Sequence, residues 1–170
     1  MAGHLLVVGM ARSGVAAANL ALAQGFRVVC TDQRADAPLV AGTDAHYGGH
    51  FRDDFVQADR IVVSPGVPAS QPDLVAAAAA GVRIEGELAF AASFLTCPIL
   101  AVSGTNGKST TTYLLGQLLD HAGVACFTGG NIGVPLSGAV GGPQQVCAVE
   151  VSSYQMEFPG WFRPRAAAIL

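Results

Sequence analysis

Residues 99–112 read Ile-Leu-Ala-Val-Ser-Gly-Thr-Asn-Gly-Lys-Ser-Thr-Thr-Thr, and they carry the strongest structural signal in the chain. The apolar start, residues 99–102, is typical of a buried parallel strand, and residues 109–119 suit a helix. The glycines therefore fall in a strand-to-helix turn, where backbone N–H groups can approach phosphates. Lys108 adds a positive charge, and the Ser109 hydroxyl is a suitable ligand for Mg²⁺. The stretch predicts a phosphate-binding loop.

The predicted nucleotide contacts all lie in this loop, and they are Gly104, Thr105, Asn106, Gly107, Lys108, Ser109 and Thr110. The longer pattern G-x-x-x-x-G-K-[ST] is not met, because Val102 stands where its first glycine would be. A glycine turn before an ordinary helix, with a solvated lysine, is the alternative interpretation. The strand and helix on either side favour nucleotide binding.

Strands and helices alternate along the rest of the chain. We predict strands at residues 5–8, 27–31, 61–63, 82–84, 125–128, 146–151 and 166–170, and helices at residues 14–24, 72–80 and 85–96. Such alternation favours a parallel sheet covered by helices on both faces. We therefore predict an α/β protein with a Rossmann-like parallel-sheet domain, residues 1–93, followed by part of a P-loop ATP-binding α/β domain, residues 94–170. The last predicted strand has no following crossover, so we expect this second domain to be truncated.

Composition excludes several classes of protein. Hydrophobic residues make up 51% of the 170 and charged residues 12%, which is enough apolar material for a buried core. A net charge of −3, without a dense cluster of Lys and Arg, argues against a nucleic-acid partner. No apolar run reaches membrane-spanning length, and the first residues do not form a signal peptide, so we expect a cytoplasmic protein without membrane insertion.

The spacing of the cysteines and histidines in the sequence does not match the spacing of metal ligands. The four cysteines are far apart in sequence, and we predict buried free thiols at Cys30, Cys97, Cys126 and Cys147. The histidines are predicted to be solvated or packed, and they are His4, His46, His50 and His121.

A second glycine-rich turn, Gly9-Met-Ala-Arg-Ser-Gly14, follows the first predicted strand and opens a helix. With Asp32 at the end of the next strand it is similar to a dinucleotide-binding fingerprint, except that Ala11 stands at the middle glycine, which admits the pyrophosphate. The helix N-terminus favours an anion. Arg12 and Ser13 can add a charge and a hydroxyl, and Asp32 and Arg34 can contact a nucleoside. A purely structural turn and an NAD(P)-binding module remain alternatives.

Taken together, six motifs in order along the chain resemble the Mur ligases of peptidoglycan synthesis, and most closely the branch that adds D-glutamate. They are Gly9-Met-Ala-Arg-Ser-Gly14, Thr31-Asp-Gln-Arg34, Ser64-Pro-Gly-Val67, Gly104-Thr-Asn-Gly-Lys-Ser-Thr110, Gly130-Asn-Ile-Gly133 and Glu150-Val-Ser-Ser-Tyr-Gln-Met-Glu157. The phosphate loop alone is also similar to that of folylpolyglutamate synthases. The Ser-Pro-Gly-Val turn and the segment from Glu150 favour the Mur ligases.

The resemblance implies that the first domain binds the UDP group of UDP-N-acetylmuramoyl-L-alanine in place of a dinucleotide. Implied substrate contacts are Arg12, Ser13, Asp32, Gln33, Arg34, Gly66, Val67, Asn131, Ser152 and Gln155. Lys108 and Glu150 are implied to act in catalysis, with Ser109 and Glu150 as the Mg²⁺ ligands.

The resemblance also implies the reaction: an ATP-dependent ligase that joins D-glutamate to UDP-N-acetylmuramoyl-L-alanine through an acyl phosphate, as a bacterial cytoplasmic monomer. In the family a metal-binding histidine, a carbamylated lysine and a C-terminal domain follow the last strand. We therefore expect this chain to bind substrate but to be inactive alone. A non-catalytic protein derived from a truncated ligase would carry the same motifs.

Overall fold

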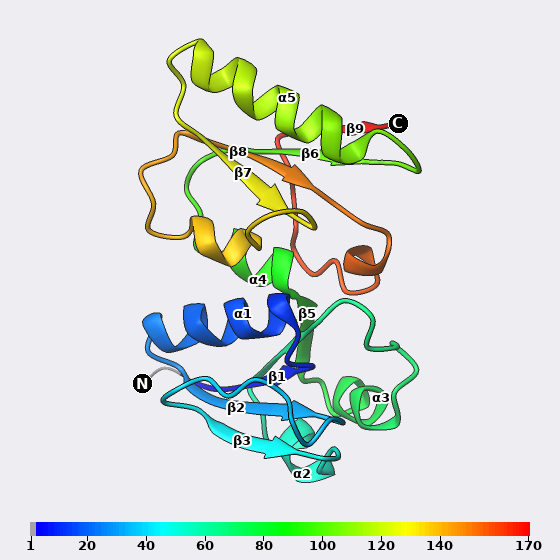
Figure 1. The fold of residues 1–170 in the computed structure, drawn as a ribbon. Helices are drawn as coiled ribbons and strands as arrows, with labels where there is room; N and C mark the ends of the chain where they lie inside the picture. Colours follow the sequence, from blue (N-terminus) through cyan, green and yellow to red (C-terminus); the bar gives the residue numbers. More distant parts are fainter. Residues whose placement is uncertain (1–2) are drawn as a thin grey trace. The chain divides into compact units, whose positions relative to one another are not determined.

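The computed structural model describes residues 3–170, which form two compact units, and the division along the chain falls between Glu87 and Leu88. Unit 1 contains a five-stranded sheet and unit 2 a four-stranded sheet, and every strand pair in both sheets is parallel. Figure 1 shows helices packed against each sheet. The structure confirms the predicted α/β class with parallel, Rossmann-like sheets.

Unit 1 is a doubly wound sheet with strand order β3-β2-β1-β4-β5. Its elements are β1 (His4–Val8), α1 (Arg12–Ala23), β2 (Arg27–Asp32), β3 (Asp44–Tyr47), α2 (Arg52–Val56), β4 (Arg60–Val63), α3 (Pro72–Ala79) and β5 (Arg83–Gly86). Helix α1 covers one face of the sheet, and α2 and α3 cover the other (Figure 1). The central strand β1 is apolar and fully buried from Leu5 to Val8, as expected for a parallel strand with helices on both faces.

Two elements of unit 1 were not predicted, and one was predicted wrongly. Strand β3 is a short polar edge strand, and α2 is a single helical turn, so neither has the apolar periodicity that predictions rely on. Residues 85–96 do not form one helix. Glu85 belongs to β5, where its buried carboxylate pairs with Arg60 and Arg83, and the helix that follows is only α4 (Glu87–Ala92).

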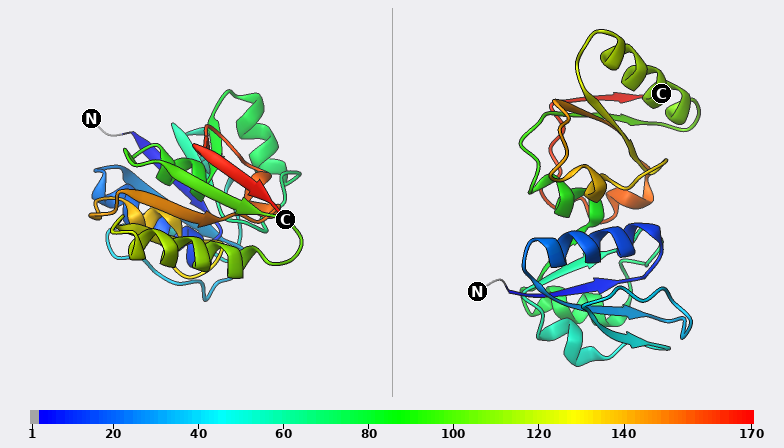
Figure 2. Two further views of the ribbon diagram at one scale, coloured as in Figure 1. Left: turned by 90° about the horizontal axis from the view of Figure 1, so that it is seen from above. Right: turned by 60° about the vertical axis from the view of Figure 1, so that its left-hand side comes forward.

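Unit 2 has strand order β7-β8-β6-β9. Its elements after α4 are β6 (Ile99–Ser103), α5 (Lys108–His121), β7 (Cys126–Gly130), the 3₁₀ helix η1 (Leu136–Ala139), β8 (Val146–Glu150), the 3₁₀ helix η2 (Tyr154–Met156) and β9 (Ala166–Ile169). Helix α5 packs on β6, β7 and β8. Figure 2 shows β9 beside β6 in both views. The strand and helix predicted around the phosphate loop are confirmed.

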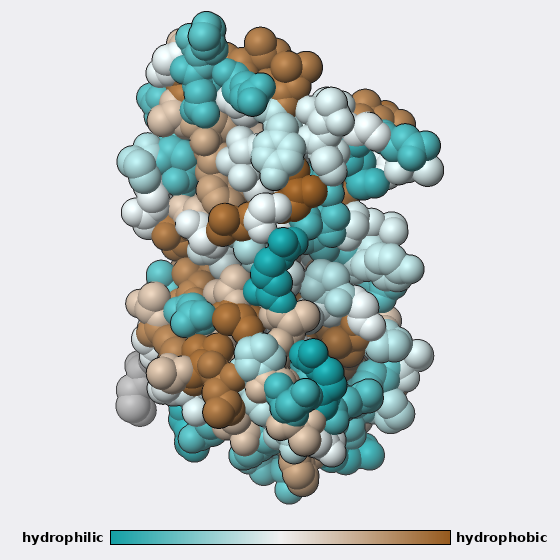
Figure 3. Space-filling view, in the orientation of Figure 1, coloured by the Kyte–Doolittle hydropathy of each residue, from teal (hydrophilic) through white to brown (hydrophobic). Residues whose placement is uncertain are grey.

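The surface mixes residue types. Figure 3 shows hydrophilic and hydrophobic residues next to one another over most of the visible face. Among residues 3–170, no helix has the length and apolar character needed to cross a membrane.

Candidate functional site

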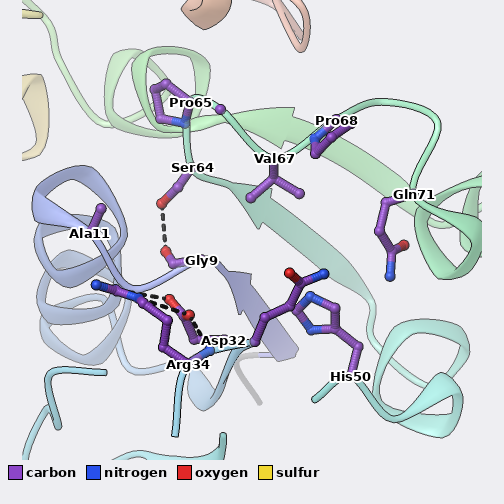
Figure 4. Close-up of a pocket in the computed structure, with 12 residues that line it drawn as sticks. Gly9, Ala11, Asp32, Arg34, His50, Ser64, Pro65, Val67, Pro68 and Gln71 are labelled. Carbon is purple, nitrogen blue, oxygen red and sulfur yellow. Dashed lines mark hydrogen bonds and ion pairs between the residues drawn. The ribbon is translucent and has the colours of Figure 1, made fainter. Parts of the chain in front are cut away.

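A pocket lies at the carboxyl edge of the unit 1 sheet, between the ends of β1 and β4. In the order β3-β2-β1-β4-β5 the chain leaves β1 to one side and later returns on its other side, and ligands of open α/β sheets bind at such a switch point. The cavity has a volume of about 280 Å³. It is lined by Gly9, Ala11, Asp32, Gln33, Arg34, His50, Ser64, Pro65, Gly66, Val67, Pro68 and Gln71 (Figure 4).

An ion pair between Asp32 and Arg34 forms one wall of this pocket (Figure 4). Arg34 Nε lies 3.2 Å from Asp32 Oδ1, and Arg34 Nη2 lies 3.2 Å from Asp32 Oδ2. The Met10 N–H also donates to Asp32 Oδ2, at 2.7 Å. Asp32 thus holds the half-exposed guanidinium of Arg34 at the pocket and ties it to the end of β1.

These contacts shift the titration of Asp32. Burial is the largest single influence and raises the pKa of the Asp32 carboxyl. The hydrogen bonds from the Arg34 side chain and from the N–H groups of Met10 and Arg34 together outweigh it, so the net pKa lies below its ordinary value. The ionised carboxylate is therefore the form that the folded protein stabilises.

We expect the Asp32→Asn variant to be less stable than the natural chain at neutral pH, by about 2 kcal/mol, because charge-assisted hydrogen bonds are lost. Since the folded pKa is lowered, this advantage is complete above the ordinary carboxyl pKa of about 4 and is lost as pH falls through the folded pKa. Thermal melts across this pH range measure the gap between the two proteins. A gap that stays constant on acidification would contradict the assigned ion pair.

The end of β4 is tied to the end of β1 by a second contact. Ser64 Oγ donates to the Gly9 carbonyl at 2.5 Å, and the two residues face each other in Figure 4. Gly14, in the first turn of α1, sits against both of them, and a Cβ there would lie 2.7 Å from Ser64 Oγ and would collide with the Gly9 carbonyl oxygen. Glycine at position 14 is what allows α1 to start this close to β1.

The structure brings most, but not all, of the predicted unit 1 residues to the pocket. Asp32, Gln33, Arg34, Gly66 and Val67 line it. The predicted contacts Arg12 and Ser13 are an exposed and a half-buried residue of α1, and neither is among the residues that line the cavity.

His50 and Gln71 line the pocket although they were not predicted as site residues. They lie on the side of the cavity opposite Ala11 (Figure 4). His50 Nδ1 is 2.9 Å from Thr31 Oγ1, and Gln71 caps α3 by accepting the Leu74 N–H at 2.7 Å. The sequence feature that could have pointed to His50 is the Gly48-Gly49 turn directly before it. This turn follows β3, which was not predicted.

The phosphate loop of unit 2 lies between β6 and α5, with its lysine folded over its own backbone. Lys108 Nζ donates to the carbonyl oxygens of Gly104 at 2.9 Å and Thr105 at 3.3 Å. Gly107 precedes α5 in a left-handed conformation with φ of 80°, which favours glycine. The loop therefore places the positive charge of Lys108 at the N-terminus of a 14-residue helix. The helix dipole also favours an anion at this position.

Glu150 is the polar centre of this site. It ends β8 opposite Val102 of β6, and its side chain is buried with 1% exposure. Its two carboxylate oxygens accept hydrogen bonds from Ser109 Oγ at 2.6 Å and from Asn131 Nδ2 at 2.7 Å. Ser109, Asn131 and Glu150 come from three separate predicted motifs, and these hydrogen bonds bring them together.

These oxygens fit a magnesium ion. Mg²⁺ prefers oxygen ligands, and it commonly takes one or two protein oxygens while phosphates and water complete its shell. Ser109 and Glu150 supply one hydroxyl and one carboxylate beside the phosphate loop. Within residues 3–170 no cluster of three or more His, Cys, Asp or Glu could hold a metal by protein ligands alone.

The remaining predicted contacts, Ser152 and Gln155, lie just after β8 and bond to each other. Gln155 Oε1 accepts the Ser152 N–H at 2.9 Å and lies 3.3 Å from the Ser152 hydroxyl. Gln155 is buried. In this structure the pair shapes the turn that follows Glu150.

Two family models match most of the chain. The model described as "Mur ligase MurD-like, N-terminal domain" matches residues 3–86, and the model described as "Mur ligase middle domain" matches residues 102–170.

Curated relatives match nearly the whole chain. A UDP-N-acetylmuramoylalanine--D-glutamate ligase of Anaeromyxobacter dehalogenans is 47% identical over 98% of this chain and 38% of its own length. The protein of that name from Geobacter metallireducens is 44% identical over 98% of this chain and 39% of its own length. The chain thus spans about two fifths of the length of these relatives.

Solved structures support the fold. A murein peptide ligase of Psychrobacter arcticus has a TM-score of 0.61 at 20% identity and covers 99% of this chain and 43% of its own. The UDP-N-acetylmuramate-alanine ligase of Thermotoga maritima has a TM-score of 0.57 at 21% identity and covers 98% of this chain and 41% of its own.

Proposed function

The chain belongs to the Mur ligase family, and on this premise we propose that it carries the substrate-binding domain and part of the ATP site of a ligase that joins D-glutamate to UDP-N-acetylmuramoyl-L-alanine. The observation that carries the proposal is the meeting of Ser109, Asn131 and Glu150 beside the phosphate loop. The choice of D-glutamate rests on the names of the relatives. We further propose that the protein acts as a monomer in the bacterial cytoplasm.

In this proposal the unit 1 pocket binds the UDP part of the substrate. A cavity of about 280 Å³ suits one portion of a larger ligand. The geometry of Asp32 disfavours a nicotinamide dinucleotide, whose ribose hydroxyls would need this carboxylate as an acceptor. Both Asp32 oxygens already accept hydrogen bonds from Arg34, and Oδ2 also accepts the Met10 N–H. Ala11, in place of the middle glycine of the fingerprint, further disfavours the close approach of a pyrophosphate to the backbone there.

Arg34 is the side chain we expect to hold the charge of the UDP group. The Arg34→Ala variant should bind UDP-N-acetylmuramoyl-L-alanine about 10- to 100-fold more weakly, because a charge-assisted hydrogen bond contributes about 1.5–3 kcal/mol. Isothermal titration measures the difference. Arg27→Ala is the matched control, since Arg27 begins β2 at the opposite edge of the sheet and pairs with Asp44. Equal weakening by both substitutions would contradict the assigned contact.

In unit 2 the protein would position and neutralise charge. The substrate carboxylate attacks the γ-phosphorus of ATP and ADP leaves, which gives an acyl phosphate. The amine of D-glutamate then attacks the acyl carbon, and phosphate leaves as the amide bond forms. Lys108 and the backbone N–H groups of the loop would stabilise charge on the transferring phosphoryl group. To do so, Lys108 must exchange its present contacts with the Gly104 and Thr105 carbonyls for phosphate oxygens.

Mg²⁺ held by Ser109 and Glu150 would supply further neutralisation of the phosphate oxygens when bound. Two neighbouring side chains fix the position of the Glu150 carboxylate. Asn131 donates to one Glu150 oxygen, while Ser109 donates to the other. Asn131 therefore orients the carboxylate, and its implied direct contact with substrate becomes secondary in this proposal.

Titration of the chain with UDP-N-acetylmuramoyl-L-alanine, and separately with NADH, tests the proposal. We expect the UDP substrate to bind and NADH not to bind. Binding of NADH without binding of the UDP substrate would contradict the proposal and support a dinucleotide-binding module.

A further inference from the structure

Three of the four cysteines gather at the edge of the unit 2 sheet where its strands begin, away from the phosphate loop. Cys97 lies two residues before β6, Cys126 opens β7, and Cys147 is the second residue of β8. The Sγ atoms of Cys97 and Cys147 are 3.5 Å apart, although the two residues are 50 positions apart in sequence. All four cysteines are free thiols, as predicted, but only Cys30 and Cys147 are buried, while Cys97 and Cys126 are half-buried. The parallel register brings Cys147 beside the Cys97-Pro98 segment.

The two sulfurs differ in access. Cys147 is fully buried, while Cys97 is half-buried and lines a cavity of about 600 Å³ within unit 2. Arg163 and Arg165 line the same cavity. Cys97 can therefore meet a small solute from solvent, whereas Cys147 is shielded from solvent.

We propose that Cys97 and Cys147 form an oxidisable thiol pair, which hydrogen peroxide converts to a disulfide between the starts of β6 and β8. The Cys97 thiolate attacks one peroxide oxygen, which gives a sulfenic acid and releases hydroxide. The Cys147 sulfur then attacks the Cys97 sulfur, the S–S bond forms, and the hydroxyl group leaves as water with the Cys147 proton. One thiolate and one thiol are oxidised to the disulfide, and one peroxide is reduced to water and hydroxide.

The order of the two steps follows from the surroundings of each sulfur. Burial, together with the neighbouring Cys97, raises the pKa of the Cys147 thiol, so Cys147 stays protonated. Cys147 is therefore assigned the second step, and its sulfur lies 3.5 Å from the Cys97 sulfur that it attacks. Cys126 is the other cysteine of this edge, and its sulfur contacts the Phe127 carbonyl at 3.4 Å instead.

The test uses the reduced 170-residue chain, treated with hydrogen peroxide and then alkylated under denaturing conditions. We expect two of the four thiols to escape alkylation, the mass of the monomer before alkylation to fall by about 2 Da through the loss of two hydrogens, and peptide mapping to find Cys97 linked to Cys147. Dithiothreitol should restore both thiols. Cys126→Ser and Cys30→Ser are matched controls that should keep the cross-link.

The Cys97→Ser variant should lose the cross-link entirely. In Cys147→Ser, Cys97 should instead accumulate as a sulfenic acid that dimedone traps. If Cys147→Ser fails to fold, the peptide map of the natural chain and the Cys97→Ser variant still decide the matter. A cross-link between Cys126 and Cys147, or peroxide treatment that leaves all four thiols free, would overturn the proposal.

Discussion

Replacing Glu150 by glutamine is expected to remove nearly all of the effect of Mg²⁺ on ATP binding. Glutamine has the size of glutamate and keeps an acceptor oxygen, but it is neutral and is a poor ligand for a hard divalent cation. Loss of a group that only supports a metal ligand costs about 10- to 100-fold in metal affinity, so loss of the carboxylate itself should cost about 100-fold or more. Titration of the chain with ATP, with and without Mg²⁺, measures the change.

The control for this prediction is Glu157→Gln. Glu157 is exposed and lies seven positions further along the same segment, so its charge is removed without touching the buried carboxylate. Its ATP binding should keep the full dependence on Mg²⁺. If Glu150→Gln binds ATP with an unchanged Mg²⁺ dependence while remaining folded, Glu150 is not the metal ligand.

Replacing Gly14 by alanine is expected to give the largest loss of stability in unit 1. The added Cβ would collide with the Gly9 carbonyl oxygen, which belongs to the backbone and cannot rotate away. Either α1 or the end of β1 must move, and the hydrogen bond from Ser64 to Gly9 would be disturbed as well. Overpacking of this kind costs about 3 kcal/mol, which lowers Tm by about 12–24 °C for a domain of this size.

Gly49→Ala is the matched control. A Cβ at Gly49 meets no atom within 4 Å, and its φ is not in the left-handed region. Its Tm should stay within a few degrees of the natural value. Circular dichroism melts of both variants provide the measurement, and a Gly14→Ala protein as stable as Gly49→Ala would show that α1 can start further from β1.

The fold could be predicted where apolar runs and glycine turns coincide. Residues 5–8 and 99–102 are buried parallel strands, and each is followed by a glycine turn and a helix, as predicted. Strand β3 could not be predicted, because its sequence Asp-Ala-His-Tyr lies at a half-exposed edge and needs no apolar pattern. The place of Glu85 in β5 could not be predicted, because a buried charge in a strand is unexpected unless its partners, Arg60 and Arg83, are known.

The residues of the candidate site also divide into those that local sequence could predict and those that depend on distant parts of the chain. The positions of Lys108 and Ser109 after the glycine turn and of Glu150 at a strand end could be predicted, because each depends on its local sequence, while their roles remain proposals. His50 could not, because its place at the pocket depends on the unpredicted strand β3. Arg12 and Ser13 follow the glycine of the motif, but the helix they start turns them out of the cavity. The contact between Cys97 and Cys147 depends on the pairing of β6 with β8, which no local pattern reports.

The most direct test of the proposed function is a chimera in which this chain replaces the aligned segment of the Anaeromyxobacter dehalogenans relative, to which it is 47% identical. We predict that the chimera releases phosphate only when ATP, UDP-N-acetylmuramoyl-L-alanine and D-glutamate are all present. Lys108→Ala in the chimera should abolish this release while binding of the UDP substrate persists. A chimera that binds the UDP substrate but releases no phosphate with D-glutamate, or releases it equally with L-glutamate, would contradict the account.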